Sequence, residues 1–144
     1  MVAYGLSEAS NDQASIYVLN VETGEKLSDI IPAEIYPSPH SPIVWNHNGS
    51  GFWYTHRHPD VPKGEEKFHQ KLYYHELGRD YRDDPMVFGE TIAKEDIPWA
   101  EASKDGNHLL VTVYKLSGRV ESTALYLYDF RNPAKGFVPV VDNP

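Results

Sequence analysis

The chain has 144 residues, a length usual for a single domain. Its 13 Lys and Arg residues against 21 Asp and Glu residues give a net charge of −8. This balance argues against a nucleic-acid partner, since such proteins gather basic residues on one face, and the absence of cysteine excludes disulfides and thiolate chemistry.

The sequence also gives no indication of a membrane or of secretion. It lacks a run of about 18 apolar residues and a basic amphipathic segment, so we expect no membrane partner. The N-terminal residues do not match a signal peptide. The sequence therefore predicts a cytoplasmic protein, with a periplasmic location left open if the chain is a piece of a longer one.

Short β-rich runs alternate with turn signals along the chain, and helical periodicity is nearly absent. Asn48-Gly49 and Asp105-Gly106 favour tight hairpin turns, because glycine accepts a positive φ. Pro139 suits an outer strand, since it cannot donate a ladder hydrogen bond. The predicted strands lie, in chain order, in residues 2–8, 15–24, 43–55 (two strands), 71–77, 101–114 (two strands), 123–130 and 136–141.

The predicted strands recur in a register. Strands starting at Ile16, Leu72 and Leu125 are 56 and 53 residues apart, and Gly49 and Gly106 are 57 apart. A repeat of roughly 40–50 residues with four strands is typical of a β-propeller blade, and rings of roughly four blades or more close. We therefore predict an all-β partial β-propeller of about three four-stranded antiparallel blades.

The expected blades cover residues 1–36, 37–92 and 93–144. The first lacks its innermost strand, because the segment VAYGLSE reads as a second strand with nothing before it. The sequence thus predicts a fragment of one propeller domain, cut from a larger ring.

Three segments carry a more specific likeness: VAYGLSEASND from Val2, VWNHNGSGFWY from Val44 and FHQKLYYHELG from Phe68. In collinear order over about residues 2–132, they resemble the propeller domain of the prolyl oligopeptidase family of serine peptidases. The resemblance implies a non-catalytic propeller that caps an α/β-hydrolase domain absent from this chain. It also implies that the propeller admits short peptides to the active site and excludes folded proteins.

Catalytic residues are not expected in this chain. The nucleophile motif G-x-S-x-G is missing, and Gly49-Ser50-Gly51 has the wrong spacing inside a predicted hairpin turn, where serine is an ordinary residue. The pairs Asp83-Asp84 and Glu65-Glu66 read as solvated loop charge. We predict no cofactor and no activity for this chain, and a serine-type oligopeptidase as its parent.

The histidines offer weak metal candidates. His69 and His75 lie on one face of a predicted strand but about 20 Å apart, too far for one metal. We interpret His75 as a structural residue facing a neighbouring blade or solvent. His56 and His58 could share a strand face, but zinc would need a further ligand such as Asp60 or His69. The sequence favours a polar, solvated loop here.

Connectivity distinguishes the two ends of the strands. The tight turns mark one end, and the longer connections gather at the other, where function tends to collect on a rigid scaffold. The segment 56–70 is rich in charge, Pro and Gly, so we expect it to be the most mobile. The variable loops span residues 5–14, 37–42, 56–70, 97–100 and 114–123.

The resemblance places the hydrolase domain over this loop face. By position it implies substrate contacts at His40, Ile43, Trp99, Ala100 and Tyr114. The sequence departs from the family pattern at three of them, since the family carries Phe near His40, Met near Ala100 and Arg near Tyr114. Either the subsite preference differs in this chain or the loops align differently.

Two functional hypotheses follow. The first is a propeller segment that gates access of short peptides to a hydrolase domain of the parent chain, and FHQKLYYHELG favours it. The alternative is a propeller-type module that binds a protein or peptide on the loop face without an enzymatic partner. A small metal-binding β protein using His56 and His58 is a third.

The incomplete ring also predicts self-association. Missing blades would leave an unpaired strand edge and an uncovered sheet face, both of which favour pairing with another chain. We expect a homo-oligomer, most simply a two-fold dimer. The aromatic side chains predicted to be uncovered are Trp53, Tyr54, Tyr126 and Tyr128.

Overall fold

The computed structural model describes residues 1–7, 14–33, 42–57, 60–117 and 122–141. They form three antiparallel sheets that follow one another along the chain. The first sheet contains β1 (Val2–Ser7), β2 (Ala14–Leu19) and β3 (Lys26–Ile31). The second contains β4 (Val44–Trp45), β5 (Gly51–Arg57), β6 (Gln70–Glu76) and β7 (Met86–Phe88). The third contains β8 (Ile97–Ala102), β9 (His108–Lys115), β10 (Ser122–Asp129) and β11 (Phe137–Val141).

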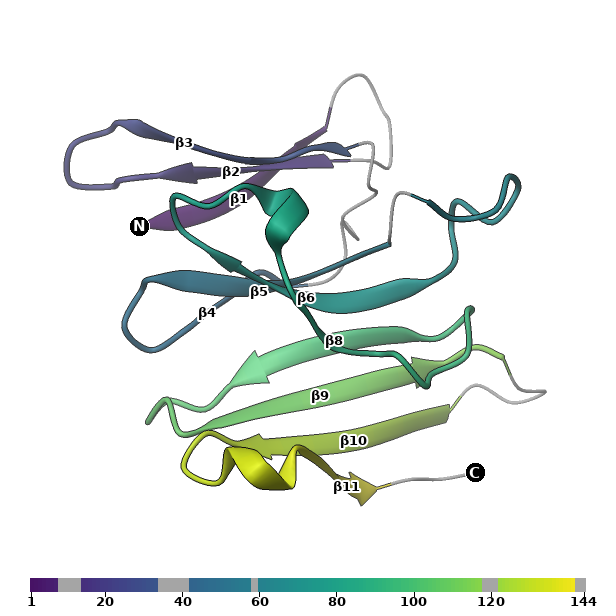
Figure 1. The fold of residues 1–144 in the computed structure, drawn as a ribbon. Coiled ribbons are helices and arrows are strands. Elements are labelled where there is room, and N and C mark those ends of the chain that lie inside the picture. The colour runs from purple at the N-terminus through teal and green to yellow at the C-terminus, as the bar shows by residue number, and fades with distance from the viewer. Residues whose placement is uncertain (8–13, 34–41, 58–59, 118–121, 142–144) are drawn as a thin grey trace.

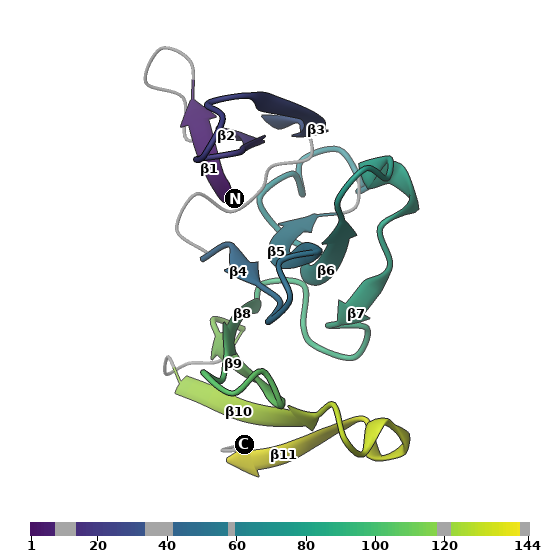
Figure 2. The same cartoon turned by 90° about the vertical axis from the view of Figure 1, so that its left-hand side faces the viewer.

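The sheets lie on top of one another in chain order (Figure 1). Within each sheet the strands pair in sequence order, as expected for blades made of consecutive hairpins. Viewed from the side, β4 and β8 lie on one edge of the stack and β3 and β7 on the other (Figure 2). Since β4 also contacts β8, the first strands of neighbouring four-stranded sheets meet, as the inner strands of a propeller do.

The nine strands located in the sequence are present in the predicted order, and β3 and β7 are two further strands that complete the expected blades. The prediction of a variable loop at residues 97–100 was wrong, because these residues pair with β9 as part of β8. The first sheet has three strands and the other two have four each. The three sheets fall within the three expected blade ranges. Short 3₁₀ helices occupy Tyr81–Asp83 and Pro133–Lys135. None of the helices in the described ranges is long and apolar enough to cross a membrane.

Both predicted glycine turns are present. Gly49 has a φ of 72° and donates its N–H to the Asn46 carbonyl in the β4–β5 turn. Gly106 has a φ of 70° and donates to the Ser103 carbonyl in the β8–β9 turn. Residues with a side chain rarely adopt this left-handed conformation, so the two glycines fix where the strands reverse.

Two apolar clusters hold the sheets together. In β5 alternate side chains point to opposite faces, so Phe52 and Tyr54 pack toward the first sheet and Trp53 toward the third. The seam between the first and second sheets contains Ile16, Val18, Ile31, Phe52, Tyr54 and Tyr73. The seam between the second and third sheets contains Trp53, Leu72, Ala100, Leu109, Val111, Val113 and Ala124.

The prediction of four uncovered aromatic side chains was wrong. Trp53 and Tyr54 are 7% and 1% exposed, because the neighbouring sheets cover both faces of β5. Tyr126 packs against Phe88 of the second sheet, with ring centroids 5.1 Å apart, and Tyr128 joins the same seam. Self-association itself stays a prediction.

Gly51 marks a place where β5 and β6 approach too closely for a side chain. A Cβ at this position would lie 2.3 Å from the His75 carbonyl oxygen and 2.5 Å from the Tyr74 hydroxyl oxygen. We expect Gly51→Ala to lower the free energy of unfolding by about 1–3 kcal/mol through overpacking, measured by urea denaturation. Gly5→Ala is the control, because its Cβ would meet only Ala14 Cβ at 3.4 Å. Equal losses in both variants would contradict this explanation.

Candidate functional site

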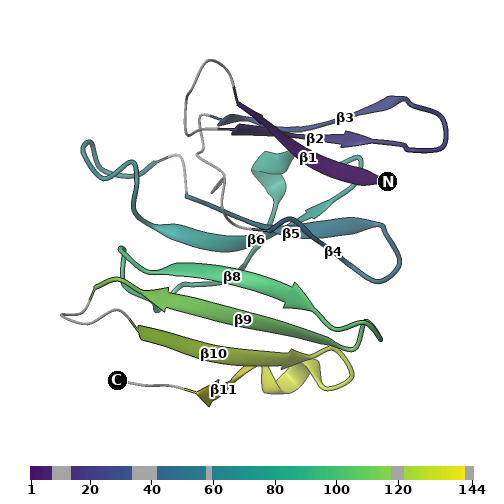
Figure 3. The ribbon, with the colours of Figure 1, turned by 180° about the vertical axis from the view of Figure 1, so that it is seen from behind.

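The two ends of the stack differ as the connectivity predicts. The β2–β3, β4–β5, β8–β9 and β10–β11 turns lie at one end, on the left of Figure 1 and on the right in the view from behind (Figure 3). The described part of the β5–β6 connection, residues 60–69, lies at the opposite end. We call these the turn end and the loop end.

Trp99 and Tyr114, two of the predicted substrate-facing residues, come together in the third sheet. Trp99 lies on β8 and Tyr114 on β9, and their rings meet edge to face with centroids 4.7 Å apart. Tyr114 is 36% exposed. The indole N–H of Trp99 is buried and has no hydrogen-bond partner among the described residues. This pair therefore offers a partly exposed aromatic surface, whereas the indole N–H itself is turned into the protein.

The other predicted substrate-facing residues do not join this pair. Ile43 packs against the cluster between the first and second sheets. Ala100 is 1% exposed and lies in the cluster between the second and third sheets. His40 lies outside the described residues. The four described positions thus do not form one continuous site, and the substrate role of all five stays a prediction.

The β5–β6 connection is held by a small ionic network at the loop end. The Glu65 carboxylate accepts a hydrogen bond from Lys94 Nζ at 2.6 Å and lies 2.5 Å from His69 Nε2. The backbone N–H of His69 donates to the backbone carbonyl of Lys94, and the Lys94 ammonium lies 5.6 Å from the Phe68 ring centroid. These contacts join the β5–β6 connection to the segment between β7 and β8.

These contacts shift the pKa values of the two charged groups. The hydrogen bond from His69 is the main cause that lowers the pKa of Glu65, and the hydrogen bond from Lys94 is the second; the bond to Glu65 raises the pKa of Lys94. Sequence reasoning missed the network, because Glu65 and Lys94 are far apart in the chain. It weighs against the mobility predicted for this segment, which stays a prediction.

His56 is part of β5 rather than of a loop. It is 4% exposed, and its ring stacks on Tyr73 at 3.7 Å and on Tyr54 at 5.1 Å between centroids. The expectation of a solvated loop was therefore wrong for His56, because β5 continues to Arg57. His58 lies outside the described residues. Within the described ranges no group of three or more His, Asp or Glu side chains is placed to hold a metal.

Ser50 is a turn residue, as the sequence indicates. Its N–H donates to the side-chain oxygens of Asn46 and Asn48, both at 3.0 Å. Its hydroxyl oxygen accepts a hydrogen bond from Asn46 Nδ2 at 2.9 Å. These contacts serve the β4–β5 reversal.

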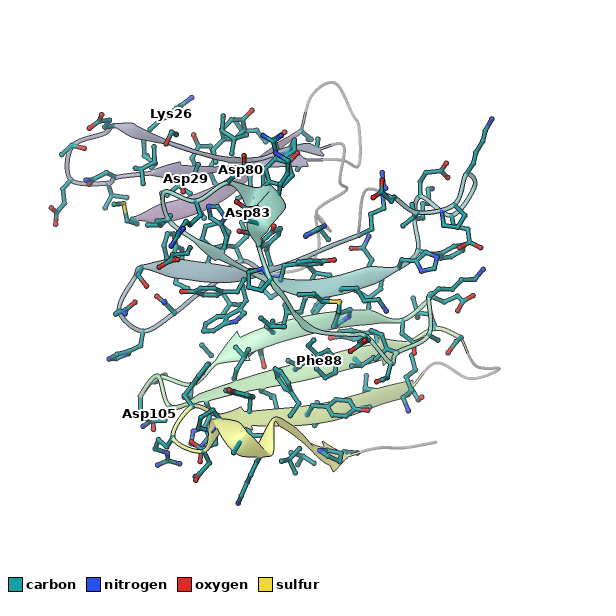
Figure 4. All side chains as sticks on the ribbon, viewed as in Figure 1. Lys26, Asp29, Asp80, Asp83, Phe88 and Asp105 are labelled. Carbon is teal, nitrogen blue, oxygen red and sulfur yellow. The ribbon has the colours of Figure 1, made fainter. Side chains whose placement is uncertain are left out.

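His75 bridges the first and second sheets. Its Nε2 lies 3.0 Å from Asp29 Oδ1 of β3, and its Nδ1 lies 2.9 Å from Asp84 Oδ2. The side chains of His75, Asp29 and Asp84 are only 1–3% exposed. Figure 4 shows Asp29 on the first sheet, close to the 3₁₀ helix that carries Asp83. The predicted position of His75 against a neighbouring blade is confirmed, whereas the solvated position predicted for Asp84 was wrong.

This cluster is structural rather than catalytic in geometry. Both ring nitrogens of His75 are engaged by carboxylates, so neither is available as a general base for a substrate. The Tyr54 hydroxyl donates to Asp84 Oδ2 at 2.8 Å. The pKa of this hydroxyl is strongly raised, mainly because the group is buried and secondly because the negative charge of Asp84 is close.

A cavity of about 670 Å³ lies at the turn end, between the second and third sheets. Trp53, Tyr74, Tyr128, Phe130 and Phe137 supply its aromatic wall. Apart from tyrosines, His47 is the one ionisable side chain of this lining, all of which belongs to the described residues. The cavity is therefore a neutral, aromatic space on the face opposite the loop end.

Together, three consecutive antiparallel sheets stacked through apolar seams define a segment of a β-propeller. A family model described as the N-terminal β-propeller domain of prolyl oligopeptidase matches residues 1–144. The chain belongs to this family.

Individual relatives support the same family assignment. The chain is 27% identical over 150 residues to prolyl oligopeptidase A of Galerina marginata, which covers 90% of this chain and 20% of that protein. It is 25% identical over 144 residues to a prolyl endopeptidase of Elizabethkingia meningoseptica, covering 98% of this chain and 19% of the relative. The chain thus spans about a fifth of the length of the curated relatives that it matches.

Solved structures show the same fold. One comes from a structural and mechanistic study of two prolyl endopeptidases and of inter-domain dynamics in their catalysis and specificity. It matches with a TM-score of 0.78 and 23% identity, over 99% of this chain and 20% of that one. Prolyl oligopeptidase B from Galerina marginata, without ligand, matches with a TM-score of 0.73 and 23% identity, over 98% of this chain and 20% of the other.

The contacts of Glu65 give a test at the loop end. We expect Glu65→Gln to speed tryptic cleavage after Lys63 and Lys67 several-fold, because the Lys94 bridge no longer holds the connection. Timed digestion followed by mass spectrometry measures the rate. Glu90→Gln, at an exposed position, is the control. An unchanged cleavage rate in Glu65→Gln would show that the bridge does not restrain this segment.

Proposed function

We propose that this chain is a non-catalytic propeller segment of a prolyl-oligopeptidase-type serine peptidase. In this proposal it helps to restrict an active site, located outside the chain, to short peptides. The observation that carries the proposal is the match of the propeller-domain family to the whole of residues 1–144. The mechanism is steric, because a rigid stack of sheets limits what can pass its loop end.

The relatives support this assignment. One structural neighbour belongs to a study that links inter-domain dynamics with catalysis and specificity in prolyl endopeptidases. Prolyl oligopeptidase B of Galerina marginata has been solved with a 35-residue hydrolysis and macrocyclization substrate. Peptide substrates and a hydrolase domain of the parent chain are therefore the partners that we propose. On the sequence grounds given above, we also propose a cytoplasmic location.

Among the predicted substrate-facing residues, Trp99 is the side chain that we propose for contact with peptides. It lies on β8, the first strand of the third sheet, which contacts β4 along one edge of the stack (Figure 2). Its ring is partly exposed and is supported edge to face by Tyr114, so it offers an aromatic surface to a peptide.

The isolated chain should not cleave peptides. It contains no G-x-S-x-G motif, and covalent peptide cleavage needs an activated nucleophile with its base. A chromogenic Gly-Pro substrate should therefore turn over at the background rate, with a complete prolyl endopeptidase as positive control. Sustained turnover by homogeneous material would contradict the assignment.

Size selection is the property to test in the peptidase that carries this chain. We expect Trp99→Ala to raise the ratio of kcat/KM for a long peptide to that for a short one by about threefold or more, because a smaller side chain at the proposed contact leaves more room for a long peptide. Competitive cleavage of peptides of about 8 and about 35 residues measures this ratio directly.

Val140→Ala is the matched control, since Val140 is 58% exposed on the edge strand β11. If Trp99→Ala lowers cleavage of both peptides equally, Trp99 contributes to stability or activity but not to size selection. If no peptidase carries this chain, the alternative function of an interaction module takes its place.

A further inference from the structure

The two seams of the stack differ in chemistry. The hydrogen bond between Thr55 Oγ1 and the Pro98 carbonyl, 2.7 Å long, crosses the seam between the second and third sheets, whose core cluster is otherwise apolar. The seam between the first and second sheets contains His75 between Asp29 and Asp84. Among the described residues, an ionic cluster whose side chains are 1–3% exposed thus crosses the first of these two seams.

The geometry at His75 suits a doubly protonated ring. Each carboxylate oxygen is an acceptor, so a ring that carries a hydrogen on both nitrogens can donate to both carboxylates. Asp29 Oδ1 also accepts the N–H of Gly78, and Asp84 Oδ2 also accepts the Tyr54 hydroxyl. A protonated His75 ring would therefore supply positive charge to two buried carboxylates at once.

We propose that His75, Asp29 and Asp84 form a protonation-dependent clasp that closes the seam between the first and second sheets, and that loss of the His75 proton loosens this seam selectively. A neutral ring can donate only one hydrogen bond. Its other nitrogen then turns a lone pair toward a carboxylate oxygen, and one buried carboxylate loses its counter-charge.

Groups on every neighbouring element face the clasp. Asp29 comes from β3, Tyr54 from β5, and Asp80, Tyr81 and Asp84 from the 3₁₀ helix and its flanks. Asp80 is held by Arg82, with bonds of 3.0 and 2.8 Å to the guanidinium. Arg82 is mainly committed to that exposed pair, so His75 is the cation in hydrogen-bond contact with Asp29 and Asp84 among the described groups.

The direction of the pH effect follows from the pKa of His75. Burial disfavours the charged ring, but the hydrogen bonds and charges of Asp84 and Asp29 outweigh burial and raise the pKa above 6.5. A group whose pKa rises on folding stabilises the fold fully below its unfolded pKa, and this stabilisation is lost as the pH rises through the folded pKa. The seam is therefore closed at mildly acidic pH and loosens on the alkaline side.

Hydrogen exchange of the 144-residue chain tests the proposal, because it locates opening within the fold. Above the raised pKa, the population in which the first sheet has opened should grow by up to about tenfold per pH unit, as expected for release of one proton. After correction for intrinsic exchange, protection should fall in β2 and β3 and stay constant in β9 and β10. Equal loss of protection in all three sheets would overturn selective loosening.

Two variants and one direct measurement complete the test. In His75→Gln the pH dependence of exchange in β2 and β3 should disappear, whereas His47→Gln, at an exposed histidine, should retain it. Persistence of the pH dependence in His75→Gln would overturn the role of His75.

Should His75→Gln fail to fold, Asp29→Asn serves instead. It removes one of the two carboxylates, so the pH at which the seam loosens should fall, and an unchanged pH would overturn the clasp. Nitrogen chemical shifts of the His75 ring in the unmodified chain need no variant. They should show two protonated nitrogens at pH 6.5, and a neutral ring at that pH would also overturn the proposal.

Discussion

The burial of the second sheet on both faces is the constraint on which the rest of the structure depends. Strand β5 is buried at every position from Gly51 to Arg57, because the first sheet covers one of its faces and the third sheet the other. A strand in this position cannot follow the simple alternation of apolar and polar residues that suits a sheet with one face exposed to solvent. Its consecutive aromatic residues therefore pack alternately into the two seams.

That constraint also explains the polar groups in the interior. Side chains of β5 and β6 near the loop end, such as His56 and Gln70, are buried because the covering sheets extend past the apolar centre. His75 is buried in the same way at the opposite end of β6. A buried ionisable side chain needs partners, and Asp29 and Asp84 supply them for His75 from a different sheet and a different loop. The stacking of the sheets thus places the charged residues Asp29, His75 and Asp84 within the seam between the first and second sheets.

The sequence predicts what depends on local chemistry. The positive φ of Gly49 and Gly106 follows from Asn-Gly and Asp-Gly, and the strands follow from β-rich runs at regular spacing. The prediction was weakest where a residue depends on partners distant in sequence. Asp84 looks like loop charge until Tyr54 and His75 are placed beside it, and Glu65 looks solvated until Lys94 approaches. For the same reason, the sequence could not reveal that Ala100 faces the interior while Trp99 and Tyr114 meet.

The two apolar clusters have a consequence for how the molecule distributes its stability. Each cluster joins one sheet to the next, and neither contains core residues from both the first and the third sheet. The described fold is therefore quasi-one-dimensional, and its stability is approximately a sum of terms for single sheets and for nearest neighbours. In such a chain of units a substitution in one seam acts mainly on the two adjoining sheets, so the stability of one seam can change while the other seam keeps its own.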